Sequence, residues 1–195
     1  MNLANIGIII AHKDKQTIKQ FEKQFAGVLN VEIVRCPLLQ ISSADCVVCS
    51  GNSYGMLDGT DAKSIGILIK GLSEQVKYVI DNAYYGEQPV GTTIVLNSTD
   101  PHYKTIAYVP IWRFKQELGN TINPYLAFRG LLTAVLNHNK VSETKIHTIL
   151  CPPLGVDQGI SGEECAKQMR LAYGFVDIGL GCSQDNAKMI DSLLN

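Results

Sequence analysis

The chain has 195 residues and is 46% apolar, which suffices for one sizeable hydrophobic core, so we expect a single domain over residues 1–195. A formal net charge of −1 and a sequence pI of about 6.4 exclude the strongly basic surface expected of a nucleic-acid-binding protein. No apolar run approaches the roughly 20 residues of a membrane span, and the N-terminus lacks the layout of a signal peptide. We therefore expect a cytoplasmic protein with neither a membrane nor a nucleic-acid partner.

The first half of the chain alternates apolar runs with helical patterns. Residues 6–11 form a continuous apolar run that predicts a central strand, and residues 14–28 carry apolar side chains at helical spacing. Residues 31–36 and 45–50 predict two further strands. One long amphipathic helix is expected over residues 61–81, because its apolar residues lie on one stripe.

The second half continues the same alternation and sets the expected fold class. Strands are expected at 92–97, 105–110 and 147–152, and helices at 120–139, 161–176 and 187–194. Strands that alternate with helices and are buried on both faces predict an α/β fold. We expect a three-layer α/β/α arrangement around a mostly parallel mixed sheet, with residues 92–110 supplying an antiparallel portion.

Two segments share one arrangement, in which a buried strand enters a glycine-rich loop and then a helix. They are DCVVCSGNSYGMLDGTD at residues 45–61 and TILCPPLGVDQGISGEECAKQM at residues 148–169. Glycine lets the backbone approach a ligand, and the N-terminus of a helix attracts anions. Ligands of such sheets bind beyond the carboxyl ends of the strands, so we expect the two loops to close on one ligand.

The cysteines and histidines give no sign of a metal or redox site. Cys46 and Cys49 have C-x-x-C spacing, but three residues apart on one strand they point to opposite faces and cannot share a metal ion. We expect the cysteines to be mostly buried, reduced thiols. The histidines have no spaced partner, so we expect no metal, no cofactor and no covalent nucleophile.

The motifs, taken together, resemble those of macro domains. SGNSYGMLDGTD resembles the first ligand loop of that family, GEQPVGTTIVLN the stretch before the next strand, and CPPLGVDQGISGEECAKQM the second phosphate loop with its helix. The order and spacing match over residues 5–177. The resemblance implies the macro-domain fold and binding of ADP-ribose or its derivatives, and some members of the family hydrolyse ADP-ribosyl bonds.

The resemblance also implies site residues in both loops. Asn52 matches the asparagine that hydrogen-bonds the distal ribose, and Asp61 matches an Asp that positions water in hydrolytic members, which makes it the catalytic candidate. Structural alternatives stay open, because Asn stabilises turns and Asp caps helices. The implied ligand contacts are Gly51, Asn52, Ser53, Tyr54, Asp58 and Gly59 in the first loop, and Leu154, Gly155, Val156, Asp157, Gln158, Gly159 and Ile160 in the second.

Two residues after the strand at 105–110 are further candidates. Trp112 has an indole that can stack on a base, and Arg113 has a guanidinium that can pair with phosphate. The alternatives are a Trp that fills the edge of the core and an Arg on the surface. Tyr54 is open to the same choice between stacking on a ligand and packing.

The sequence departs from the macro-domain pattern at three places. The family commonly carries an Asp after the second strand that reads the adenine amino group, whereas this chain has Cys36, Pro37 and Leu38 there. Asp157 and Asp58 place carboxylates where a diphosphate or a glycine is usual. These departures predict that the phosphates are held differently or that the ligand is not plain ADP-ribose.

The leading hypothesis is a protein that binds, or sequesters, ADP-ribose or a nucleotide derived from it, including a cyclic signalling form. The alternative is an ADP-ribosyl hydrolase acting on ADP-ribosylated protein or O-acetyl-ADP-ribose, with Asp61 or Asp58 orienting water. A third hypothesis is a scaffold with an eroded pocket. The expected partner in the first two cases is a small-molecule nucleotide.

Overall fold

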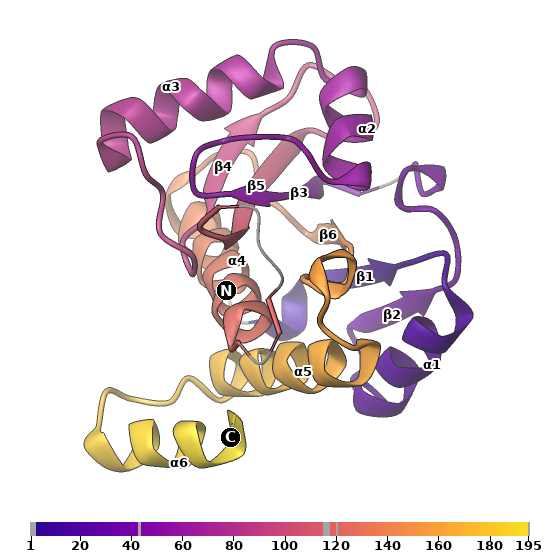
Figure 1. The fold of residues 1–195 in the computed structure, drawn as a ribbon, viewed down its shortest axis with the longest axis vertical. Coiled ribbons are helices and arrows are strands. Elements are labelled where there is room, and N and C mark those ends of the chain that lie inside the picture. The colour runs from indigo at the N-terminus through magenta and orange to yellow at the C-terminus, as the bar shows by residue number, and fades with distance from the viewer. Residues whose placement is uncertain (1–2, 43, 115–117, 120, 195) are drawn as a thin grey trace.

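The computed structural model describes residues 3–42, 44–114, 118–119 and 121–194, and a six-stranded mixed sheet forms its centre (Figure 1). The strand order is β2-β1-β6-β3-β5-β4, in which β4 alone of these strands is antiparallel to its neighbour. The strands are β1 (Gly7–Ala11), β2 (Val31–Val34), β3 (Cys46–Asn52), β4 (Ile94–Asn97), β5 (Thr105–Trp112) and β6 (Thr148–Cys151).

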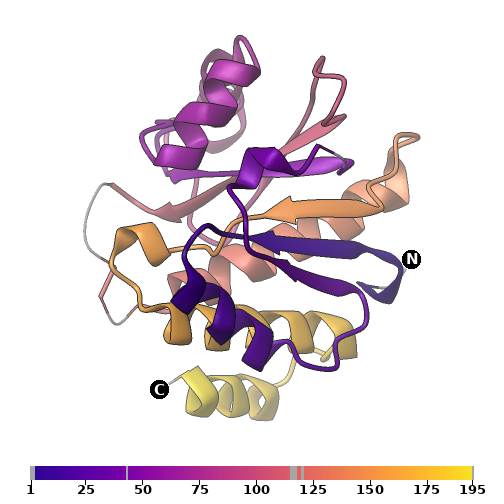
Figure 2. The ribbon, with the colours of Figure 1, turned by 90° about the vertical axis from the view of Figure 1, so that its right-hand side faces the viewer.

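Helices cover both faces of the sheet, which makes the three layers of the expected α/β/α fold (Figure 2). One face packs against α1 (Lys15–Gln24), α4 (Asn123–Val141) and α5 (Gly162–Ile178). The other packs against α2 (Thr60–Leu68) and α3 (Leu72–Tyr84). Beyond α5 lies α6 (Gln184–Leu194), and three short 3-10 turns are η1 (Leu3–Asn5), η2 (Leu38–Gln40) and η3 (Val156–Gln158).

The predicted strands and most predicted helices are confirmed within a few residues, but the single helix over residues 61–81 is wrong. The chain forms α2 and α3 instead, and the break falls at Gly71, whose φ is +78°. Glycine adopts this left-handed conformation without the steric penalty that a Cβ would bring. Both helices keep the apolar stripe that suggested one helix, because Ile65, Val76 and Ile80 all face the same core.

The alternation along β3 separates its two cysteines, as predicted. Cys46 packs into the core beside α4 and α5, whereas Cys49 packs into the core beside α2 and α3. Burial raises the pKa of each thiol to about 12, so both stay protonated at neutral pH. None of the helices formed by the described residues is long and apolar enough to cross a bilayer.

The parallel strands bring their carboxyl ends to one edge of the sheet. At this edge β1 is followed by His12, β3 by the loop that leads to α2, and β6 by the loop that leads to α5. The two glycine-rich loops are about 100 positions apart in the sequence, yet β6 pairs directly with β3. The sheet therefore places both loops beside each other, where ligands of open α/β sheets bind.

Candidate ligand-binding site

A pocket lies at this edge of the sheet, between the two glycine-rich loops. It is narrow in this conformation, with a cavity volume of ≈ 10 Å³, and both loops and the end of β1 contribute to its wall. The described residues that line it are His12, Ser50, Gly59, Thr60, Asp61, Pro152, Pro153, Asp157 and Gln158. The lining is mostly polar, and it holds two carboxylates.

The two carboxylates come from different loops and interact. Burial raises the pKa of Asp61 above its ordinary 3.8, the nearby charge of Asp157 raises it further, and His12 and Lys13 oppose the shift. Asp61 is half-buried in the first turn of α2, whereas Asp157 is exposed on η3. Two carboxylates that face one pocket accept hydrogen bonds from hydroxyl groups, and they repel an anion placed between them.

The N-terminus of α2 opens into the same pocket. Its N-cap is Gly59, which has no side chain to bond the first amide groups of the helix, whereas Asp14 caps α1 and Ser161 caps α5. The sequence predicted that this helix begins at Asp61. It begins one residue earlier, at Thr60, so Asp61 is the second residue of the helix. Uncapped amide groups at a helix N-terminus favour an oxygen ligand, including a phosphate.

Asn52 has the loop-stabilising role in this structure, while its amide nitrogen is left without a partner among the described residues. Its Oδ1 accepts hydrogen bonds from the backbone N–H groups of Tyr54, at 2.9 Å, and Met56, at 3.2 Å, and so shapes the first loop. Its Nδ2 is buried and has no hydrogen-bond partner among the described residues. A buried amide donor without a partner costs free energy, so a ligand oxygen that reached it would relieve that cost.

Gly51 and Gly59 serve different purposes in the first loop. A Cβ at Gly51 would overlap the ring of Tyr108, whose hydroxyl donates to the Asn52 carbonyl at 2.7 Å. Glycine is therefore required at position 51 by packing on the side of the sheet that α2 and α3 cover. At Gly59 a Cβ would meet only Ala62 at 3.9 Å, so this glycine is free of such a contact and lines the pocket.

Trp112 takes the packing role. It is 3% exposed and belongs to the core beside α4 and α5, and its indole N–H has no hydrogen-bond partner among the described residues. A face buried in this way is not available to stack on a base in this conformation. β5 positions it, because Trp112 pairs with Asn52 across a register shift at the end of β3.

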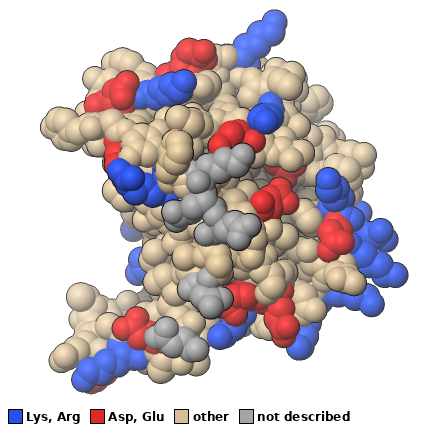
Figure 3. All heavy atoms as spheres, viewed as in Figure 1, with Lys and Arg blue, Asp and Glu red and all other residues tan. Residues whose placement is uncertain are grey.

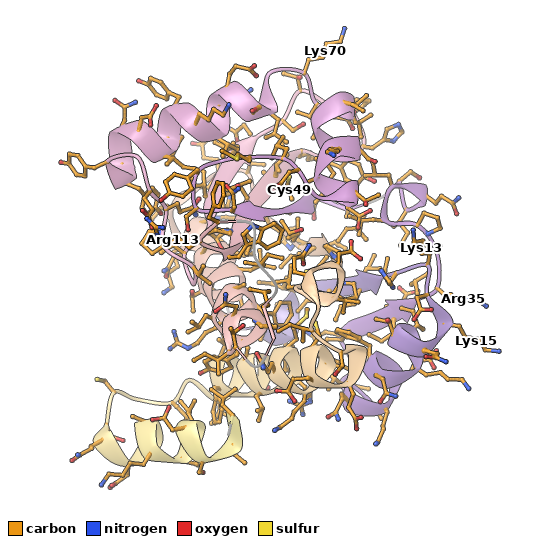
Figure 4. The ribbon with its side chains drawn as sticks, viewed as in Figure 1. Lys13, Lys15, Arg35, Cys49, Lys70 and Arg113 are labelled. Carbon is orange, nitrogen blue, oxygen red and sulfur yellow. The ribbon has the colours of Figure 1, made fainter. Side chains whose placement is uncertain are left out.

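Arg113 already has a carboxylate partner. Its guanidinium binds Glu87 through two hydrogen bonds of 2.6 and 2.9 Å, and it lies over the ring of Tyr54 at 5.5 Å (Figure 4). The Tyr54 hydroxyl donates to the same Glu87 carboxylate at 2.9 Å. A ligand phosphate would have to compete with Glu87 for Arg113, and Tyr54 packs within this cluster rather than into the pocket lined by Asp61.

The second loop is anchored by its apolar residues and presents its polar ones. Leu154 and Ile160 are buried in the core and Val156 packs against it. Asp157 and Gln158, which lie between these apolar residues in the sequence, line the pocket. The remaining two expected contacts, Gly155 and Gly159, have φ values of +112° and +91°, which shape the turn around η3.

Two other expected contacts are not pocket walls among the described residues. Ser53 is buried, and its backbone N–H donates to the Trp112 and Arg113 carbonyls at 3.1 and 3.2 Å, which ties the first loop to β5. Asp58 has a buried carboxylate oxygen without a hydrogen-bond partner among the described residues. Residues 51–55 also have G-x-S-x-G spacing with Ser53 as the serine, which the sequence analysis missed. The serine of a nucleophile elbow is exposed and lies on a strained turn. Ser53 is instead buried and has no positive φ.

Sequence reasoning missed several residues that line the pocket. They are His12, Ser50, Thr60, Pro152 and Pro153. A signal was present for most of them, because His12, Ser50 and Pro152 end or directly follow the predicted strands at 6–11, 45–50 and 147–152. The carboxyl ends of parallel strands meet at the ligand edge, so side chains at those ends belong in a candidate set.

Comparison with known proteins identifies the fold. No protein-family model and no curated protein matches the chain. The macrodomain of Mycobacterium tuberculosis DarG superposes with a TM-score of 0.59 at 17% identity, covering 73% of this chain and 89% of that one. A mutant of the Oceanobacillus iheyensis macrodomain with ADPR gives a TM-score of 0.60 at 14% identity, covering 100% and 95%. The chain therefore has the macrodomain fold that its loop motifs predicted.

Proposed function

We propose that the chain binds ADP-ribose or a nucleotide derived from it in the pocket between the two glycine-rich loops. The solved macrodomains of this fold include one from Oceanobacillus iheyensis with ADP, at 18% identity and a TM-score of 0.56, and Thermosipho africanus DarTG in complex with ADP-ribose, at 12% identity and a TM-score of 0.52. The Thermosipho structure aligns over 95% of this chain and 57% of that one. These likenesses support the ligand class.

The observation that carries the proposal is that Asp61 and Asp157 line one pocket from two different loops. The residues are 96 positions apart in the sequence, come from different loops, and lie close enough for the charge of one to raise the pKa of the other. A pocket walled by both loops is what a ligand held between them requires. Its carboxylates suit the hydroxyl groups of a ribose, each of which donates a hydrogen bond.

The remaining groups suit the other parts of such a ligand. The uncapped amides of α2 provide donors for a phosphate oxygen at Gly59 and Thr60. The buried Nδ2 of Asn52 offers one further donor. Because two carboxylates stand at the pocket, we place sugar hydroxyl groups against Asp61 and Asp157 and the phosphates against α2. Both a linear and a cyclic derivative of ADP-ribose meet this requirement, and sequestration of such a signal would need tight binding alone.

Calorimetry with ADP-ribose, cyclic ADP-ribose and NAD tests the proposal. We expect at least one of them to bind with micromolar or tighter affinity, about −8 kcal/mol. Asn52→Asp keeps the acceptor for the backbone N–H groups of Tyr54 and Met56 but removes the amide donor. It should weaken binding by roughly 1–3 kcal/mol.

Asn137→Asp on the exposed surface of α4 is the matched control, and it should bind as the wild type does. Absence of binding heat with all three nucleotides would contradict the proposed function. Equal losses in both variants would instead trace the effect of Asn52→Asp to added negative charge at any site.

Hydrolysis of an ADP-ribosyl bond is the second candidate, and the raised pKa of Asp61 is the observation that favours it. A half-buried carboxylate near a ribose can orient a water molecule for attack. We expect release of ADP-ribose from modified protein, or of acetate from O-acetyl-ADP-ribose, to be slow or absent. Rapid release by the wild type that Asp61→Asn abolishes, with ligand binding retained, would establish the enzyme instead.

A further inference from the structure

Three side chains outside the pocket meet at the start of the first glycine-rich loop. The Glu87 carboxylate, just beyond α3, accepts two hydrogen bonds from the Arg113 guanidinium, at 2.6 and 2.9 Å. It accepts a third from the Tyr54 hydroxyl at 2.9 Å. Tyr54 belongs to the first loop, whereas Arg113 directly follows β5. We call Tyr54, Glu87 and Arg113 the Glu87 cluster, and it joins the loop to two segments that are distant in the sequence.

Packing and backbone contacts hold the same part of the loop. The Arg113 guanidinium lies over the Tyr54 ring, 5.5 Å from its centre. The Phe114 ring meets the Tyr54 ring edge to face, with 6.2 Å between the ring centres. Next to the cluster, the backbone N–H of Gln88 donates to the Ser53 carbonyl at 2.8 Å. The start of the first loop is therefore fixed against the segment after α3 and against the end of β5.

The Glu87 cluster lies at the surface, so its hold on the loop is modest. The side chains of Arg113 and Glu87 are 65% and 40% exposed. Figure 4 shows Arg113 on the left side of the molecule, and acidic and basic side chains adjoin on that side in the space-filling view (Figure 3). Solvent screens exposed ion pairs, which shift an equilibrium a few-fold rather than by orders of magnitude. A loop held in this way can exchange between a held and a released state.

The held loop leaves the candidate site closed to a nucleotide. The cavity volume of the pocket is ≈ 10 Å³. That is about the space of one water molecule, whereas small-molecule pockets measure about 300–1,000 Å³. The Nδ2 of Asn52 is buried without a partner among the described residues, and its Oδ1 accepts from the Tyr54 N–H. A ligand that fills the pocket and reaches this donor therefore requires the first loop to move.

We propose that Glu87 is a positioning residue that gates the candidate site. Through Arg113 and Tyr54 it holds the first loop in a closed state, and release of the Glu87 cluster admits the nucleotide. This inference rests on the proposed function, because it concerns access to the same pocket. None of the three side chains is among the described residues that line the pocket, so an effect of Glu87 on binding has to pass through the loop.

Amide hydrogen exchange, followed by NMR on the full chain without ligand, tests the hold on the loop. The backbone N–H of Ser53 donates to the Trp112 carbonyl at 3.1 Å. The backbone N–H of Tyr54 donates to the Asn52 Oδ1 at 2.9 Å. Glu87→Ala removes the acceptor of all three hydrogen bonds in the cluster, so both amide groups should exchange about threefold to tenfold faster. The amide groups of β1 should exchange at the wild-type rate, because the fold is kept.

Calorimetry with ADP-ribose then tests the gate. A protein whose binding-competent state is a minor fraction binds its ligand more weakly by that fraction. Release of the loop in Glu87→Ala should therefore tighten binding about threefold to tenfold. Arg113→Gln breaks the same ion pair and leaves no free cation for a phosphate, and it should also tighten binding. Loss of a merely supporting contact would instead weaken binding in both variants.

Lys104→Gln is the matched control, because it breaks the ion pair that the exposed Lys104 makes with Asp45, at 3.7 Å, next to the opposite end of β5. It should change neither the exchange rates nor the affinity. Unchanged exchange in Glu87→Ala, or weaker binding in both variants, would overturn the gate and leave the proposed function standing. Tightening in Glu87→Ala alone would trace the effect to the freed Arg113 cation and overturn the gate as well. Absence of binding by the wild type and by both variants would defeat the proposed function and the gate with it.

Discussion

Replacing Gly51 with Ala should lower the free energy of unfolding by about 1–3 kcal/mol, the usual cost of an added group in a well-packed interior. The new Cβ would overlap the ring of Tyr108, and that ring is fully buried among residues of α2, α3 and the sheet. Movement of the ring would also break the hydrogen bond from its hydroxyl to the Asn52 carbonyl, which is 2.7 Å long. Urea unfolding monitored by circular dichroism measures the loss.

Gly59→Ala is the matched control, because it adds the same methyl group to the same loop. Its Cβ meets only Ala62, at ordinary contact distance, and its φ of −71° suits any residue. We expect a change within about 0.5 kcal/mol, as for a surface substitution. A second check is Gly51→Ala in a Tyr108→Leu background, where the smaller side chain should recover part of the loss. Equal effects of Gly51→Ala and Gly59→Ala would show that the Tyr108 ring accommodates the methyl group.

The layered fold was predictable because its signals are local. Short apolar runs mark strands buried on both faces, and β1, β3 and β6 each contain one. Side chains three residues apart on a strand point to opposite faces of the sheet, so the sequence predicted that Cys46 and Cys49 are separated. They pack into different cores. The break between α2 and α3 was missed because a continuous apolar stripe predicts one helix. Gly71 interrupts the helix through its left-handed backbone conformation, which the apolar pattern does not reveal.

The chemistry of the site was predictable in part, since charge partners are set by tertiary contacts. Arg113 looked free for a phosphate, yet it binds Glu87, which lies 26 positions earlier and carries no pattern that links the two. Trp112 follows the predicted strand at 105–110, a position where burial and exposure are equally consistent with the sequence. In the structure it is the last residue of β5 and is buried in the core beside α4 and α5. Asp61 and Asp157 were each singled out, but their interaction depends on the pairing of β3 with β6.

Asp61→Asn should stabilise the fold at neutral pH. The folded state raises the pKa of Asp61, mainly through burial and then through Asp157, so keeping this carboxylate ionised costs free energy of folding. That cost is fully present above the raised pKa and disappears as the pH falls towards 3.8, its ordinary value. Thermal unfolding should therefore show a higher Tm for the variant at neutral pH and a smaller difference in acid.

Asp61→Asn should also weaken ligand binding. The direction of the change in affinity distinguishes recognition of a sugar hydroxyl by Asp61 from simple repulsion of a phosphate. If Asp61 accepts a hydrogen bond from a sugar hydroxyl, its loss should cost about 1.5–3 kcal/mol, or roughly 10- to 100-fold in Kd. Asp157→Asn should act in the same direction, less strongly because Asp157 is exposed. A carboxylate within ~5 Å of a phosphate, at an effective dielectric near 20, would instead cost about 3 kcal/mol, so its removal would tighten binding. Calorimetry on both variants decides: tighter binding of ADP-ribose would place phosphate rather than sugar between the two carboxylates.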